Sequence, residues 1–113
     1  MPIYRGTQTA QAAGTSFKPD LKPNDRFGPR GGHARIRAKN LTAANSTVAE
    51  TIYIGNDLVE NRGVIPADAG GNVDNFTPAV EGVGGPGDVI DVTFTTIGSA
   101  ASTFNWVVEI ENA

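Results

Sequence analysis

The chain has 113 residues and a mass of 11.8 kDa, which is the size of one domain and leaves no room for separate catalytic and binding domains. It contains no cysteine and one histidine, which excludes a disulfide framework, a thiolate nucleophile and a cysteine or histidine-rich zinc site. The formal net charge of −3 is unevenly distributed, because residues 1–39 carry +6 and the other 74 residues carry −9. This pattern excludes most familiar small-enzyme chemistry and indicates a basic segment joined to an acidic body.

Residue usage favours strands over helices. Valine, isoleucine and threonine together number 29, against three leucines and one methionine. β-Branched side chains lose rotamer freedom in a helix but pack well on a pleated surface. No stretch keeps the apolar spacing of a helix over several turns. We therefore expect an all-β chain.

Residues 1–33 are predicted to form an extended basic N-terminal arm. The segment contains nine glycine or proline residues, no valine, and apolar residues without a regular period. Proline biases the residue before it toward extended backbone and cannot donate a hydrogen bond inside a sheet. Spaced apolar and basic side chains on such an arm would anchor it on another protein. The residues expected to bind a partner are Tyr4, Arg5, Phe17, Lys18, Leu21, Lys22, Arg26, Phe27 and Arg30.

Other interpretations of the charge asymmetry stay open. The basic and acidic parts can neutralise each other within one monomer, and the N-terminal segment can be a solvated tail. An arm with Tyr4, Phe17 and Phe27 among its charges could also follow a phosphate backbone and stack on bases. The acidic body argues against this, so nucleic acid is not an expected partner.

Residues 34–113 are predicted to form a body of about six to eight short strands separated by turns. Residues 34–41 alternate in polarity, so that three basic side chains point away from a core. Further strands are expected at 48–54, 58–59, 64–65, 73–76, 78–83, 89–97 and 103–111, with turns at 55–57, 61–63, 69–72 and 98–102.

The last two of these strands are expected to form a hairpin that dominates the core. Trp106 has the largest apolar side chain, and its neighbours at two-residue spacing are apolar, so it is placed at the core centre. The predicted core residues are Ile90, Val92, Phe94, Phe104, Trp106, Val108 and Ile110. Short strands without a crossover helix predict a single antiparallel β-sandwich, jelly-roll-like or a small barrel.

Candidates for chemistry are few. Carboxylate pairs occur near strand ends and on outward faces, where acidic side chains ordinarily serve solvation rather than acid-base catalysis. Asp68, Asn72, Asp74 and Asn75 could offer oxygen ligands to calcium, but their spacing differs from the EF-hand pattern and favours an Asx-rich turn. No known motif places a serine or threonine nucleophile beside His33, so the sequence does not indicate a catalytic triad. We expect no enzyme activity, no cofactor and no metal site.

Membrane association is not expected either, because no apolar stretch approaches roughly 18 residues and no signal peptide is evident.

The chain is short, free of cysteine, poor in leucine and rich in glycine, threonine and valine. It begins with the segment MPIYRGTQTAQAAGTSFKPDLKPNDRFGPRGG and has a β body ending in TFNWVVEIENA. In this layout it resembles small virion proteins of bacteriophages and is most similar to capsid decoration, or cement, proteins. The resemblance implies a non-enzymatic structural protein, made in the host cytoplasm and located on the capsid surface. It would bind the major capsid protein and neighbouring copies of itself, as a homo-oligomer or part of a large assembly.

Two alternative functions use the same architecture. A self-assembling coat or tail-tube subunit would use the sandwich and the arm to polymerise. A carbohydrate-binding β-sandwich module would need exposed aromatic side chains on a sheet face or loop. Tyr53 is the main aromatic residue beyond the arm that the strand pattern leaves available for this role.

Overall fold

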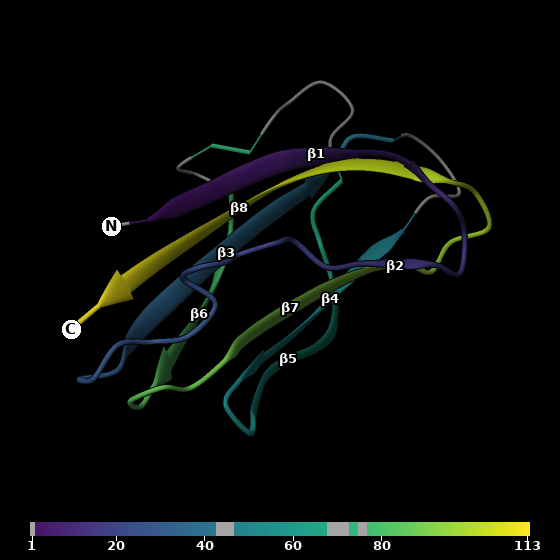
Figure 1. Cartoon of the computed structure of the whole chain (residues 1–113). Coiled ribbons are helices and arrows are strands. Elements are labelled where there is room, and N and C mark those ends of the chain that lie inside the picture. The colour runs from purple at the N-terminus through teal and green to yellow at the C-terminus, as the bar shows by residue number, and fades with distance from the viewer. Residues whose placement is uncertain (1, 43–46, 68–72, 75–76) are drawn as a thin grey trace.

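The fold is a sandwich of two sheets (Figure 1). The computed structural model describes residues 2–42, 47–67, 73–74 and 77–113. In these residues all regular structure is β, and eight strands form two antiparallel sheets of four strands each. The described ranges include no helix of the length and apolarity needed to cross a membrane. The expectation of an all-β antiparallel sandwich is confirmed.

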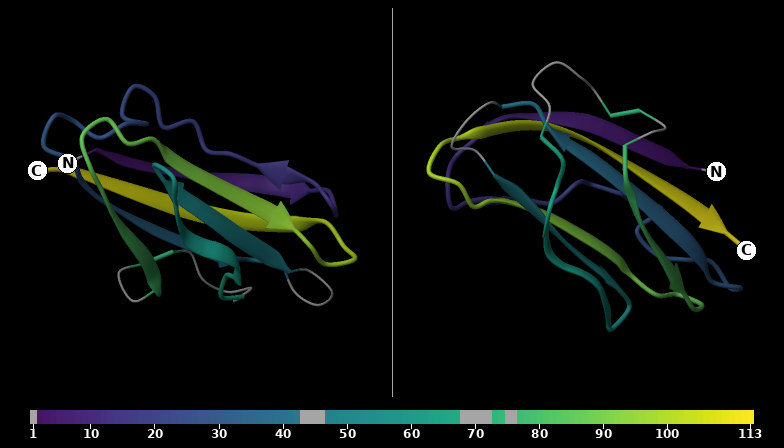
Figure 2. Two further views of the ribbon diagram at one scale, coloured as in Figure 1. Left: turned by 90° about the horizontal axis from the view of Figure 1, so that it is seen from below. Right: turned by 180° about the vertical axis from the view of Figure 1, so that it is seen from behind.

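Most connections cross from one sheet to the other. Sheet A has the order β1-β8-β3-β6, and sheet B has the order β2-β7-β4-β5. Of the pairs of strands that are consecutive in sequence, only β4 and β5 lie in the same sheet, so the chain passes from one sheet to the other at all the remaining connections (Figure 2). The bounds are β1 Ile3–Gln11, β2 Ser16–Phe17, β3 Gly32–Asn40, β4 Val48–Ile54, β5 Asp57–Val64, β6 Ala79–Gly84, β7 Ile90–Thr96 and β8 Ser102–Asn112.

The predicted hairpin of residues 89–97 and 103–111 is wrong. β7 pairs with β2 and β4 in sheet B, whereas β8 pairs with β1 and β3 in sheet A. The two strands face each other across the core, where the ring centroids of Phe94 and Phe104 are 5.3 Å apart. Each strand has one strongly apolar face, and stacking the strands in opposite layers buries both faces against each other.

The core lies between the sheets and is built from alternating residues. On β3, Ala34, Ile36 and Ala38 are at most 2% exposed, while the basic residues between them point outward. The seven residues expected in the core on β7 and β8 are all at most 8% exposed, with Trp106 the most exposed of them. A predicted turn at 61–63 is instead part of β5, which is irregular there: its register shifts and Arg62 has φ 54°.

The expected N-terminal arm is not confirmed. Ile3–Gln11 is paired with β8, and Ser16–Phe17 is paired with β7. The segment that follows places Leu21 and Phe27 in the core, where they are 4% and 3% exposed. In place of a separate arm, the described N-terminal residues complete one edge of each sheet, and position 33 lies inside β3. The composition of the segment did not reveal these strands, because an edge strand that is buried on one side tolerates polar residues and glycine.

Candidate interaction surfaces

The apolar residues expected to anchor an arm lie inside this chain's own sandwich. Leu21 and Phe27 belong to the buried core. Phe17 packs against that core, with its ring centroid 6.2 Å from that of Phe104 and 6.1 Å from that of Trp106. In this conformation the three side chains stabilise the monomer and are not available as anchors on a neighbour.

The remaining residues expected on the arm have mixed surroundings. The Tyr4 hydroxyl accepts a hydrogen bond from Asn24 Nδ2 at 2.6 Å. Lys18 Nζ lies 3.2 Å from Asp91 Oδ1, and Arg26 Nη1 donates to the Gly87 carbonyl at 3.3 Å. Arg5, Lys22 and Arg30 are exposed and form no ion pair with another described residue.

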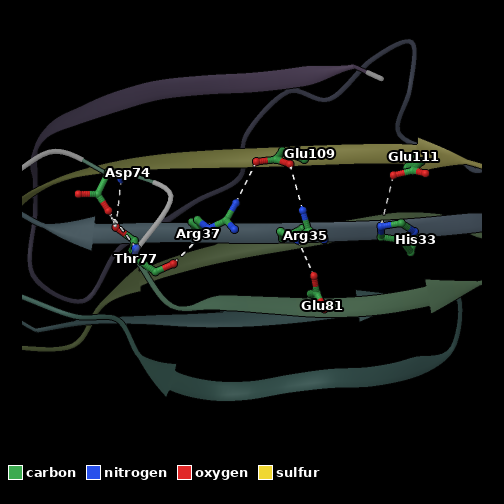
Figure 3. A network of polar contacts seen from close by, with 8 residues as sticks. All are labelled: His33, Arg35, Arg37, Asp74, Thr77, Glu81, Glu109 and Glu111. Atoms are coloured by element: carbon green, nitrogen blue, oxygen red, sulfur yellow. Dashed lines mark hydrogen bonds and ion pairs between the residues drawn. The ribbon is translucent and has the colours of Figure 1, made fainter.

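A network of ion pairs crosses the outer face of sheet A (Figure 3). Glu109 on β8 lies between two arginines of β3: its Oε1 is 2.9 Å from Arg37 Nη1, and its Oε2 is 3.5 Å from Arg35 Nη1. Arg35 also contacts Glu81 on β6 through its Nε atom. The register explains the network, because Arg35 is directly opposite both Glu109 and Glu81 and shares a face with them. The hydrogen bond from Arg35, reinforced by its charge, lowers the pKa of the Glu81 carboxyl.

A turn extends the network at one end of β3. Arg37 Nε donates to the Thr77 carbonyl at 3.1 Å, and Thr77 in turn donates from N and Oγ1 to Asp74 Oδ1 at 3.0 and 3.2 Å. Asp74 is one of the four residues considered for calcium, and the other three lie outside the described residues. The described ranges hold no group of three or more histidine, cysteine, aspartate or glutamate side chains that could bind a metal ion.

The lone histidine belongs to the same face. His33 Nε2 is 3.6 Å from Glu111 Oε2, and an open hollow beside it is lined by Val83 and Ala113. Among the described residues, no serine or threonine hydroxyl hydrogen-bonds to this imidazole. The arrangement is that of a surface charge pair and does not form a nucleophile activated by a base.

The outer face of sheet B is different in character. Tyr53 and Leu58 are directly opposite each other on β4 and β5 and are 40% and 47% exposed. Val64 and Ile97, near the other end of β4, are 65% and 41% exposed. Between these ends lies the neutral cross-strand pair Thr51 and Thr93, while Asp91, directly opposite Tyr53 on β7, forms an ion pair with Lys18. We call these four apolar residues and the threonines between them the sheet B outer face.

Sequence reasoning missed a buried carboxyl, that of Glu50. Register places Glu50 on the inner face of β4, opposite Phe94, and it is 8% exposed with no hydrogen-bond partner at Oε2. Burial, and to a smaller extent the charge of Glu60, raises the pKa of Glu50 to about 7. The signal in the sequence that could have identified it is its two-residue spacing from Val48 and Ile52, because residues at that spacing share one face of a strand.

Comparison with known proteins does not assign the chain to a protein family. No family model matches it, and neither a curated protein nor a solved structure does. The features of this chain that can indicate a function are therefore the two outer faces and the edges of the sandwich.

Proposed function

We propose that the chain is a non-enzymatic viral structural protein that binds and stabilises a phage capsid, as a decoration, cement or minor capsid protein. The observation that carries the proposal is the group of exposed apolar side chains on the sheet B outer face, and the resemblance in composition to such proteins supports it. Its partner is the major capsid protein, on the surface of the virion.

The sheet B outer face has the properties of a contact surface. Single exposed apolar residues are ordinary on a protein surface. Here, however, exposed apolar side chains occupy both ends of β4, with threonines between them and no acid or base in the cross-strand pair at the centre. The fully buried centre of a protein interface is more apolar than the rest of the surface, and aromatic side chains such as Tyr53 are enriched there.

The opposite face is less suited to that role. Its arginines and glutamates are already paired with one another across β3, β6 and β8. Covering these pairs with another protein would remove water from several charges at once, and the existing ion pairs would only partly offset that loss. Attachment through sheet B also leaves the N-terminal strands in place, which agrees with the burial of Leu21 and Phe27.

Bare phage capsids that lack the chain provide the test. The intact protein should bind them saturably and raise the temperature at which the particles break open. Leu58→Lys combined with Val64→Lys should weaken binding at least about tenfold, because two charges would be placed in the contact. Lysine is well tolerated on edge strands, so the fold should survive.

The matched control is Val83→Lys, at a side chain 78% exposed on β6 of the other sheet. It should bind capsids like the unaltered protein. Equal loss of binding in the control and in the double variant would refute the proposed face, and no binding of the intact protein would refute capsid attachment. Tubes or shells formed by the protein alone would point to a self-assembling coat or tail-tube subunit instead.

A carbohydrate-binding module is the second candidate function. Tyr53 favours it, because it is the only aromatic residue in the described part of the chain whose side chain is exposed. Sugar rings pack on such faces, and binding would then depend on one side chain. Glycan binding that is abolished by Tyr53→Ala and unaffected by Leu58→Lys would support this candidate over capsid attachment.

A further inference from the structure

We propose that β1 is an exchangeable strand: residues 3–8 of one copy pair with β8 of a second copy, at the place that the same residues occupy in the closed monomer. The inference identifies a second copy of this chain as the partner and β8 as its docking surface. It concerns the free protein and does not rest on the proposed capsid function.

β1 contributes little to the core of its own subunit. None of its residues belongs to the buried apolar cluster, and only Tyr4 packs partly against it. Ile3, at the start of the strand, is 49% exposed. What holds β1 is its antiparallel register with β8, from Ile3 opposite Glu109 to Gln8 opposite Phe104. A second copy offers the same backbone partners, so exchange conserves nearly every contact that release removes.

The surface that β1 covers is selective for this particular strand. Trp106 of β8 lies directly beneath Gly6, and a Cβ atom at position 6 would be 2.9 Å from the Trp106 Cζ2 atom. A different residue there would have to displace a buried indole ring. Two positions earlier, the Tyr4 hydroxyl must reach Asn24. A strand with glycine and tyrosine at this spacing fits the surface, and the N-terminal strand of a second copy meets both conditions.

The chain is strained at Ala10, near the end of β1, and the connection that follows to β2 is short. The β1–β8 register breaks between Gln8 and Gln11, and Ala10 has φ 52° while Gly14 has φ 80°. Left-handed backbone is unfavourable for alanine. The strain arises because the chain must turn within residues 9–15 from the edge of sheet A to β2 in sheet B. Short strained connections promote strand exchange, because opening them relieves the strain while the strand contacts are kept.

Disulfide trapping tests the exchange directly, because the chain has no cysteine of its own. Ile110 N donates to the Pro2 carbonyl, which makes residues 2 and 110 a hydrogen-bonded pair. Pair types alternate along an antiparallel ladder, so Arg5 and Val107 form a non-hydrogen-bonded pair with closely spaced side chains. One protein carries Arg5→Cys and a second carries Val107→Cys. The two are unfolded together, refolded at high concentration and oxidised.

Exchange predicts a disulfide between the two different chains. The control replaces Val107→Cys with Glu111→Cys, which is more exposed and four residues further along the same strand. The yield of mixed dimer should be at least tenfold higher for the Arg5 and Val107 positions. Equal yields, or monomers with no mixed dimer in either mixture, would overturn the proposal.

A second measurement does not depend on mixing variants. The double variant Arg5→Cys/Val107→Cys is oxidised as the isolated monomer at low concentration, so that the disulfide closes within one chain and locks β1 onto its own β8. Sedimentation should show that dimers of the unaltered protein are lost in the locked form and return on reduction. Ala10→Gly, which removes the strain, should lower the dimer association constant roughly tenfold. Dimers that persist in the locked form would refute strand exchange.

Discussion

The two outer faces of the sandwich differ in how their side chains are used. On sheet A, Arg35 and Arg37 are paired with Glu81 and Glu109 within the monomer. On sheet B, Tyr53 and Leu58 are exposed apolar side chains, and the ion pair that Asp91 forms with Lys18 lies beside Tyr53. The difference shows that a strong charge asymmetry along a sequence need not produce a charged binding surface, because folding places basic β3 between acidic strands. The surface left for a partner is then the one with more exposed apolar side chains.

Both faces lie over one common core, and removing the largest side chain of that core should have the largest effect on stability. Trp106→Ala deletes a side chain that is 8% exposed and packs against Phe17. We expect a loss of roughly 3–5 kcal/mol in the free energy of unfolding, measured by denaturant titration. Val83→Ala, at an exposed position, should change it by less than about 0.5 kcal/mol. A small loss for Trp106→Ala would contradict the described packing.

Glu50 makes the interior behind sheet B sensitive to pH. Its folded-state pKa of about 7 lies above the ordinary value of 4.5, so the folded chain binds the proton more tightly than the unfolded chain. This stabilisation is full below pH 4.5 and is lost as the pH rises toward 7, a fall of about 3 kcal/mol. Unfolding measured from pH 4 to pH 8 should show this fall, and Glu50→Gln should flatten it.

The matched variant is Glu60→Gln, whose charge is the smaller cause of the raised pKa. It should shift the fall only slightly to lower pH. If Glu50→Gln leaves the pH dependence of unfolding unchanged, the inward position of Glu50 is wrong.

The paired charges of sheet A should contribute less than the core. Glu109→Gln weakens the contacts to both Arg35 and Arg37 and leaves Arg37 without its carboxylate partner, while Arg35 keeps its ion pair with Glu81. We expect a loss of roughly 1–2 kcal/mol at low salt, shrinking at 1 M salt because screening weakens the ion pairs. Glu81→Gln, at a more exposed position, should cost less. A larger loss for Glu81→Gln would reverse the assigned centre of the network.

The smallest effect on stability is expected on the sheet B outer face. Leu58→Lys and Val64→Lys alter side chains that are 47% and 65% exposed, so each should change the free energy of unfolding by less than about 0.5 kcal/mol. Losses as large as that of Trp106→Ala would mean that these residues are part of the core and not a contact surface.

Strand identity was predictable where alternation is strong. The inward positions of β3, β7 and β8 follow from apolar residues at every second place, and the structure buries those residues. β1 was not predictable in this way, because its inner face presents Tyr4, Gly6 and Gln8 in place of an apolar run. Gly6 becomes intelligible only once Trp106 is known to lie beneath it.

The candidate surfaces show the same limit. The basic residues of β3 were expected to point outward, but their partners Glu81 and Glu109 are 46 and 72 residues away in sequence from Arg35 and Arg37, respectively. Likewise, the exposure of Val64 depends on its being on the edge strand β5. Local pattern carries no information on which strand becomes an edge.

The amino-acid sequence by itself determined that this protein is built of strands and which side of its regular strands is apolar, because β-branched usage and two-residue alternation are local properties of the chain. Only the tertiary structure decided that the basic N-terminal residues complete the sandwich, that β7 and β8 lie in opposite layers, and that the arginines of sheet A are neutralised. These outcomes depend on pairing between distant segments, which is governed by the burial of whole faces and not by the neighbours of any one residue.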